Sequence, residues 1–265
     1  MKRNMFPLIA MILGMGVVYY GIFDSGGTTI MFISIPSLFI VLGGSFAALA
    51  IVYPLKELKK IPKIFKVLLS QSTYDLPDLV LLFEGLARKA RKEGILSLES
   101  SLEEIEDGFL RKGLQLVIDG SEADEIKQIL NTEIEALELR HIRNQELFTK
   151  WGILAPGFGM IGTVIGLVIM LGNLSTDPTE LGAGMATALI TTFYGSLFAN
   201  LLFEPIAANL SFKTEDEVMF RNIMIQGITM IQGGANPRVV KEILMTHLSP
   251  DEKLEVLDLQ DEIRS

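Results

Sequence analysis

The sequence predicts an all-α integral membrane protein with four transmembrane helices, a helical cytoplasmic domain between spans 2 and 3, and a helical cytoplasmic C-terminal tail. Four stretches contain no Asp, Glu, Lys, Arg or His: residues 5–22, 30–53, 151–172 and 182–203. Each has about the 20 residues that a helix needs to cross a bilayer. The chain of 265 residues is 49% hydrophobic, with a mean hydropathy of +0.40, which is too apolar for a soluble protein of this size.

Composition also excludes several classes of function. There is no Cys, and His141 and His247 are far apart in sequence, so we expect no disulfide and no metal site. The net charge of −9 argues against nucleic acid, which selects basic surfaces. Gly157, Gly159 and Gly162 match G-x-G-x-x-G, but they lie in an apolar helix with no strand before them. We therefore expect neither an enzyme nor a bound cofactor.

The first apolar stretch, residues 5–22, has two possible interpretations. It follows Lys2 and Arg3, as the core of a signal peptide would. However, no small-x-small cleavage site follows it, and Tyr19 and Tyr20 suit a membrane interface. We therefore expect a retained transmembrane helix.

Basic residues predict the topology of the four spans. They occur before the first span and after the second and fourth: Lys2, Arg3, Lys56, Lys59, Lys60, Lys63, Lys66, Lys213 and Arg221. The two short loops contain Asp24, Asp177 and Glu180 but no Lys or Arg. The positive-inside rule then places both termini and the central segment in the cytoplasm.

The central segment, residues 54–150, is expected to form a helical cytoplasmic domain. Asp75 can cap a helix with Pro77 in its first turn, and glycines are expected to punctuate the helices that follow: Gly94, Gly108, Gly113 and Gly120. After Ser121, apolar residues recur at helical spacing: Ile126, Ile129, Leu130, Ile134 and Leu137. This pattern predicts a long helix that runs directly into the third span.

The C-terminal segment, residues 206–265, is expected to continue the fourth span as a helix until Gly233 and Gly234. Pro237 then opens a short helix, and Ser249 with Glu252 forms a capping box for another. The acidic final residues are expected to fray. The expected domains are therefore residues 1–53 with two spans, 54–150, 151–205 with the other two spans, and 206–265.

Two prolines and two threonines distinguish the third and fourth spans. Pro156 and Pro205 lie toward the cytoplasmic ends, where each removes a backbone hydrogen bond and can bend its helix. Thr163 and Thr192 each lie 12 residues from that face, a depth of roughly 18 Å, so both hydroxyls are expected at one level. The alternative is that each threonine bonds back to its own helix and the prolines are merely tolerated.

Small residues on both spans permit close helix contact: Gly157, Gly159, Gly162, Gly166, Gly184, Ala188, Gly195 and Ala199. They can pack the two spans against each other, or they can pack around the helix of another protein. The sequence leaves both possibilities open.

The four spans carry no acidic or basic side chain, although an ion transporter usually carries one where the ion binds. If the chain moves an ion, the titrating carboxylate must come from a partner helix. The chain itself can contribute hydroxyls, small residues and prolines.

Several motifs resemble the flagellar stator A subunit family, MotA and PomA. They are A-P-G-F-G-M-I-G-T-V-I-G-L-V in the third span, L-I-T-T-F-Y-G-S-L-F-A-N in the fourth, I-V-L-G-G-S at residues 40–45, A-R-K-A-R-K-E-G-I-L-S-L-E at residues 87–99, and N-P-R near the C-terminus. The match covers nearly the whole chain, in order. The motifs are specific as a set, although none would suffice singly.

The resemblance implies a ring of A subunits in the bacterial inner membrane, a pentamer around two B subunits (MotB or PomB) anchored to peptidoglycan. An aspartate of the B subunit would accept the ion, and the turning ring would push the rotor switch protein FliG. The resemblance also implies that Pro156 and Pro205 occupy the motif positions of the family's coupling prolines. Arg91, Lys92 and Glu99 occupy charged rotor-contact positions, with Arg88 a weaker candidate, and a solvated helical face is the alternative for this charge run.

The sequence leaves alternatives open for the transported ion and for the function. Thr163 and Thr192 match hydroxyls of sodium-driven relatives, but Ser34 stands where some of those carry an acidic residue, so the resemblance favours protons over Na⁺. The first alternative function is another energiser of the superfamily, of the TolQ or ExbB type, which typically has three spans. The second is a non-conducting membrane scaffold.

Overall fold

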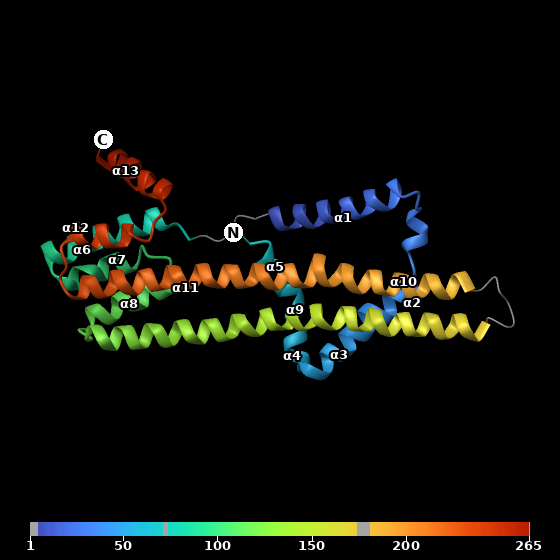
Figure 1. Cartoon of the computed structure of the whole chain (residues 1–265). Coiled ribbons are helices and arrows are strands. Elements are labelled where there is room, and N and C mark those ends of the chain that lie inside the picture. The colour runs from blue at the N-terminus through green and yellow to red at the C-terminus, as the bar shows by residue number, and fades with distance from the viewer. Residues whose placement is uncertain (1–4, 71–73, 174–180, 265) are drawn as a thin grey trace. The chain divides into compact units, whose positions relative to one another are not determined.

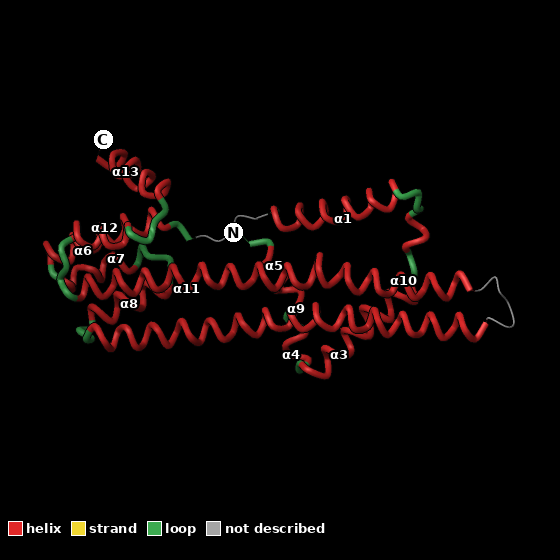
Figure 2. The backbone as a smooth tube through the Cα atoms, in the orientation of Figure 1, coloured by secondary structure: helices red, strands yellow, loops and turns green. Residues whose placement is uncertain are grey.

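The computed structural model describes residues 5–70, 74–173 and 181–264, with side chains as far as Gln260. Every regular element in this part of the chain is a helix, as Figure 2 shows. Four helices are long and apolar enough to cross a membrane: Phe6–Asp24, Thr29–Val52, Ala123–Asn173 and Leu181–Gln232. The four predicted spans are thus helical. Lys2, Arg3, Asp177 and Glu180, which the predicted topology uses, lie outside the described residues.

The chain divides into two compact units, whose helices are labelled in Figure 1. Unit 1 is Met1–Gln71 with Arg140–Phe212, and unit 2 is Ser72–Leu139 with Lys213–Ser265. Residues 54–71, 140–150 and 206–212 belong to the same compact unit as the spans.

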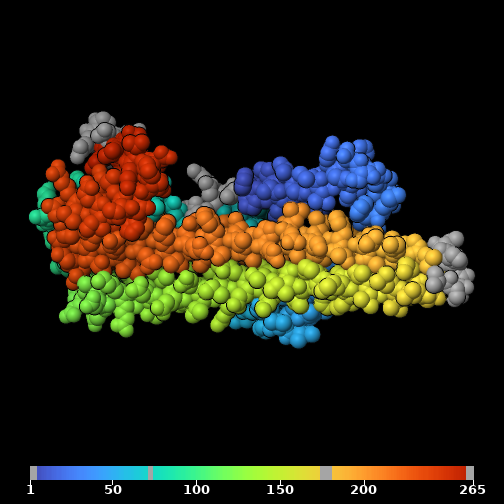
Figure 3. All heavy atoms as spheres, viewed as in Figure 1, coloured from blue at the N-terminus to red at the C-terminus, as the bar shows by residue number. Residues whose placement is uncertain are grey.

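In unit 1, α1 (Phe6–Asp24) starts with Pro7 in its first turn and buries none of its residues. Figure 3 shows its blue surface on the outside of the unit. An apolar helix exposed in this way is suited to lipid.

The second span consists of consecutive pieces: η1 (Thr29–Phe32), α2 (Ile35–Leu38), the π-helical η2 (Phe39–Gly43) and α3 (Gly44–Val52). Ser34 caps α2, because its side chain accepts a hydrogen bond from the Ser37 N–H. The span ends at Tyr53, which is extended, as expected of a residue before proline.

Two short helices follow, α4 (Leu55–Leu58) and α5 (Ile61–Leu68). They bury Leu58, Ile64 and Leu68 in the same core as Phe148 and Phe203. This apolar packing explains why residues 54–71 belong with the spans and not with the rest of the central segment.

The remaining helices of the spans are long. α9 (Ala123–Asn173) is continuous, so the prediction of a helix that runs directly into the third span is confirmed. The fourth span is α10 (Leu181–Phe198), followed by the π-helical η5 (Ala199–Phe203) and α11 (Glu204–Gln232).

Unit 2 contains α6 (Leu76–Glu93), η3 (Ile95–Leu98), α7 (Glu99–Leu102), α8 (Gly108–Ile118), α12 (Pro237–Met245) and α13 (Pro250–Arg264), with the adjoining parts of α9 and α11. Asp75 caps α6 as predicted, and α12 begins at Pro237 as predicted, with Asn236 as its cap. Ser249 and Glu252 form the predicted capping box of α13. The core of the unit includes Phe83, Leu110, Leu114, Ile126, Ile223 and Ile228.

Two expectations for unit 2 were wrong. Gly113 does not interrupt a helix: it lies inside α8, where a Cβ would come 2.4 Å from Ile228 Cδ1, so the glycine permits close packing. The acidic C-terminus is helical as far as Arg264. Its capping box and the buried side chain of Val256 stabilise α13.

Candidate functional site

The two candidate ion-path threonines meet between α9 and α10. The hydroxyl oxygens of Thr163 and Thr192 are 2.5 Å apart. Thr163 Oγ1 also lies 3.0 Å from the Gly159 carbonyl oxygen and 3.2 Å from that of Ala188, and Thr192 Oγ1 lies 3.3 Å from the latter. Because each hydroxyl has one hydrogen and two lone pairs, this cluster retains acceptor capacity after its internal bonds are made.

The four candidate packing glycines lie at the contact between α9 and α10. A Cβ on Gly159 would lie 3.0 Å from the Thr191 carbonyl oxygen, and one on Gly162 would lie 2.5 Å from Thr191 Cγ2. A Cβ on Gly166 would lie 2.6 Å from the backbone of α10, and one on Gly195 would lie 2.9 Å from the Ala155 carbonyl oxygen. This arrangement favours packing within the chain over packing around the helix of another protein.

The two candidate coupling prolines lie where regular helical hydrogen bonding is interrupted. Pro156 is inside α9, and a Cβ on Gly195 would come 3.1 Å from its Cα. Pro205 follows the π-helical turn η5, in which the Glu204 N–H bonds to the Ala199 carbonyl. Because Pro205 has no N–H to donate, it accounts for the change from α-helical to π-helical hydrogen bonding directly before it.

Two polar links between spans were missed by the sequence analysis. Trp151 Nε1 donates a 3.0 Å hydrogen bond to the buried Ser45 Oγ, and its ring stacks on Phe203 at a centroid distance of 4.2 Å. Tyr194 Oη accepts a 3.2 Å hydrogen bond from the Ser34 N–H and donates one to the Phe32 carbonyl. The only signal in the sequence was a polar side chain within an apolar stretch.

The candidate rotor-contact charges lie on the end of α6 and the start of α7. Arg91 and Lys92 are exposed in the last turn of α6, which Gly94 ends at φ 88°, and Glu99 is exposed at the start of α7. Within the described side chains, no ion pair joins these three residues to another residue. Their charges are available to another molecule.

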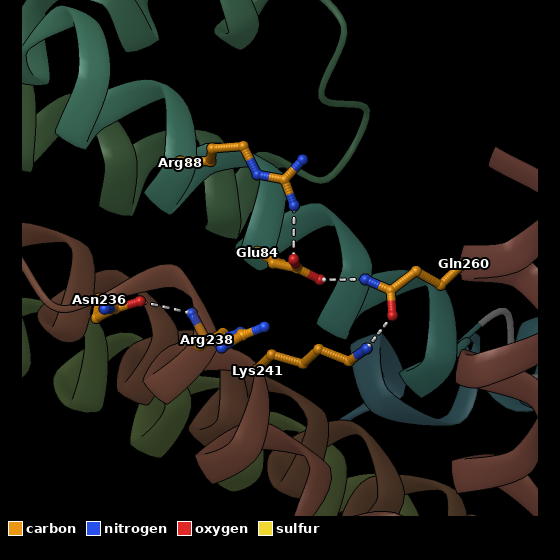
Figure 4. Close-up of polar contacts among 6 residues, drawn as sticks. All are labelled: Glu84, Arg88, Asn236, Arg238, Lys241 and Gln260. Atoms are coloured by element: carbon orange, nitrogen blue, oxygen red, sulfur yellow. Dashed lines mark hydrogen bonds and ion pairs between the residues drawn. The ribbon is translucent and has the colours of Figure 1, made fainter. Parts of the chain in front are cut away.

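Arg88 differs from these three because it already has a partner. Its guanidinium lies 2.6 Å from Oε1 of Glu84, which is buried. Gln260 of α13 donates a 3.2 Å hydrogen bond to the other oxygen of Glu84 and accepts a 2.6 Å bond from the buried Lys241 of α12 (Figure 4). One amide thus bridges two buried charges, which would be costly without partners. In the sequence, only the i,i+4 spacing of Glu84 and Arg88 indicated part of this network.

A second polar contact joins the start of α6 to α11 within unit 2. Burial, followed by the neighbouring Glu217 carboxylate, raises the pKa of Tyr74 well above its ordinary value. The Tyr74 ring lies 4.7 Å from the Phe220 ring. Glu217 forms a 2.8 Å ion pair with Arg221, whose guanidinium lies 4.8 Å from the centre of the Phe109 ring.

The fold and these contacts define a class: a multi-pass, all-helical membrane protein whose uncharged spans meet at a pair of hydroxyls. Residues 101–223 match the family described as MotA/TolQ/ExbB proton channel family. Motility protein A of Borreliella burgdorferi is 39% identical over 249 residues, covering 92% of this chain and 95% of the relative. The Bacillus subtilis protein named uncharacterized protein YtxD is 44% identical over 246 residues, covering 92% and 90%.

A solved structure supports the same assignment. The flagellar MotAB stator complex from Bacillus subtilis matches with a TM-score of 0.87 and 33% identity, covering 94% of this chain and 97% of that chain. The chain belongs to the MotA/TolQ/ExbB proton channel family and, within it, to the motility protein A relatives. The resemblance found from the motifs is therefore confirmed.

Proposed function

We propose that this chain is the A subunit of a flagellar stator and that, with a B-type partner, it forms a channel that couples ion influx to rotation. Its similarity to motility protein A and to a MotAB complex over more than nine tenths of its length supports this function. The observation that carries it is that the spans place a hydroxyl pair between two helices but contain no Asp, Glu, Lys, Arg or His. The ion acceptor would therefore be an aspartate of the B subunit.

The proposed assembly is a homo-oligomer, a pentamer around a B dimer, in the bacterial inner membrane. Both termini and the charged end of α6 would face the cytoplasm. The distribution of lysines and arginines around the spans supports this orientation.

Torque would pass through the charges on α6 and α7. Arg91, Lys92 and Glu99 would contact FliG, and Arg88 would contribute less because Glu84 already binds it. Exposed charge pairs are individually weak and screened by salt, which suits a surface that must engage and release repeatedly. Pro156 and Pro205 would couple ion binding to movement of the third and fourth spans.

We take the transported ion to be the proton, which needs only the carboxylate of the partner. The hydroxyl pair makes Na⁺ the competing candidate, because oxygen ligands suit a hard cation. Motility that depends on external sodium at a fixed proton-motive force would identify Na⁺ instead.

The experiment is swimming by stator-deleted bacteria with a compatible rotor, carrying this chain alone or with its B-type partner. We expect swimming only when both are present. Failure to swim, despite membrane assembly of both chains, would favour a TolQ- or ExbB-type energiser, which shares the family but drives no flagellum. Absence of ion flux as well would favour a non-conducting scaffold.

A further inference from the structure

A line of polar residues continues from Thr192 toward Pro205 on the exposed side of the fourth span. Ser196, Asn200 and Glu204 follow Thr192 at intervals of four, and all four residues are exposed. Side chains four residues apart lie on the same face of a helix. The line ends beside Pro205, over a length of roughly 18 Å.

The π-helical turn keeps this line straight. Steps of four residues slightly exceed one turn of an α-helix, so a polar line drifts around the axis. A π-helical turn contains more than four residues, and it offsets that drift. In this chain η5 (Ala199–Phe203) contains Asn200 and ends directly before Glu204, where the drift would otherwise move Glu204 off the line.

Asn200 has oxygen atoms that can still accept hydrogen bonds. Its Nδ2 donates a 2.8 Å hydrogen bond to the Ser196 carbonyl, so the side-chain Oδ1 remains an acceptor. The Glu204 N–H bonds to the Ala199 carbonyl. Pro205, which would follow it in the π register, has no N–H to offer to the Asn200 carbonyl.

This face is unsuited to lipid. An amide or a carboxylate in hydrocarbon is costly, and such residues in a span face water or protein. The other exposed residues of these helices do suit lipid: from Ile153 to Leu171 in α9, every exposed residue is apolar. In α10 the exposed residues before Thr192 are likewise apolar, including Met185 and Leu189. The polar line is therefore a distinct surface.

We propose that Ser196, Asn200 and Glu204 line the exit half of the ion path and hold the water that carries a monovalent cation away from the Thr163–Thr192 pair. This inference rests on the proposed function. The hydroxyls and carbonyls supply neutral oxygens along the line, and the Glu204 carboxylate at its end attracts the cation toward the aqueous side.

The chain contains no cysteine, so single cysteines can report which positions meet water. The complex with a cysteine-free B partner would carry Ser196→Cys or Asn200→Cys, with Ile12→Cys as the control on the lipid-suited face of α1. The probe is a membrane-impermeant, positively charged methanethiosulfonate added to inside-out vesicles. We expect both line positions to react and position 12 to stay unmodified. Protection at both line positions would overturn the proposal and show that a helix of the partner or of another copy covers this face.

Conduction provides a second test that separates this proposal from the proposed function. Asn200→Leu should lower ion flux by about tenfold, the loss expected when the water in the path loses one hydrogen bond, with assembly unchanged. The control is Thr187→Val, because the Thr187 hydroxyl bonds to its own helix at 3.0 Å and lies on a different face from Thr192. Wild-type flux in Asn200→Leu would contradict the exit path but leave the stator function intact. Absence of flux in the wild-type complex would contradict the function itself.

Discussion

Gly166→Ala tests whether the contact between α9 and α10 is as close as the structure indicates. A Cβ at this position would lie 2.6 Å from both the Ala188 nitrogen and the Gly184 carbonyl oxygen, far inside the 3.4 Å at which ordinary contact begins. Both atoms are backbone, so no side chain can rotate away, and the two helices must separate. Overpacking of this kind costs about 1–3 kcal/mol. The better helix propensity of alanine offsets about 0.5–1 kcal/mol of that cost.

The assay is the thermal midpoint of the detergent-solubilised complex, followed by size-exclusion chromatography. Gly172→Ala is the matched control, because Gly172 is on the same helix and a Cβ there meets nothing within 4 Å. We expect Gly166→Ala to lower the midpoint and Gly172→Ala to leave it unchanged or to raise it. Equal midpoints for the two variants would refute the close contact.

Three further predictions concern unit 2. Because burial and Glu217 raise the pKa of Tyr74, the folded chain keeps a proton that the unfolded chain releases near pH 10. The contribution of Tyr74 to the free energy of unfolding is therefore fully present below that pH and falls above it by about 1.4 kcal/mol per pH unit. Tyr74→Phe should abolish this loss at alkaline pH. Thermal midpoints of the variant that still showed the same loss above pH 10 would contradict the role of Tyr74. Gln260→Leu should destabilise the unit by about 1–3 kcal/mol, since the buried Glu84 loses a donor, and an unchanged midpoint would argue against the bridge. Arg91→Glu and Glu99→Lys should each reduce torque in tethered cells without changing membrane assembly, and full torque in both would remove the rotor-contact assignment.

The sequence predicts those features that depend on local pattern. Apolar length identifies the four spans, and helical spacing, with no Gly or Pro between Ala123 and Trp151, predicts the helix that runs into the third span as α9. Equal spacing from the ends of the spans places Thr163 and Thr192 at one depth, and their hydroxyls do meet.

Features that depend on tertiary contact could not be predicted in this way. Gly113 has the sequence signal of a helix break, but it lies inside α8 because Ile228 packs against it. Gln260 has no distinguishing signal in the sequence, and its role appears only when α13 meets Glu84 and Lys241. Likewise, nothing in an apolar stretch indicates that Trp151 bonds to Ser45.

The four spans of this chain contain no Asp, Glu, Lys, Arg or His, so the carboxylate that binds the ion within the membrane is expected to come from the partner. The most direct measurement is ion flux into proteoliposomes that contain this chain with its B-type partner, compared with a partner whose transmembrane aspartate is replaced by asparagine. We expect flux with the intact partner and none with the substituted one. Equal flux in both preparations would contradict it, because the ion would then cross without the carboxylate that the four spans of this chain lack.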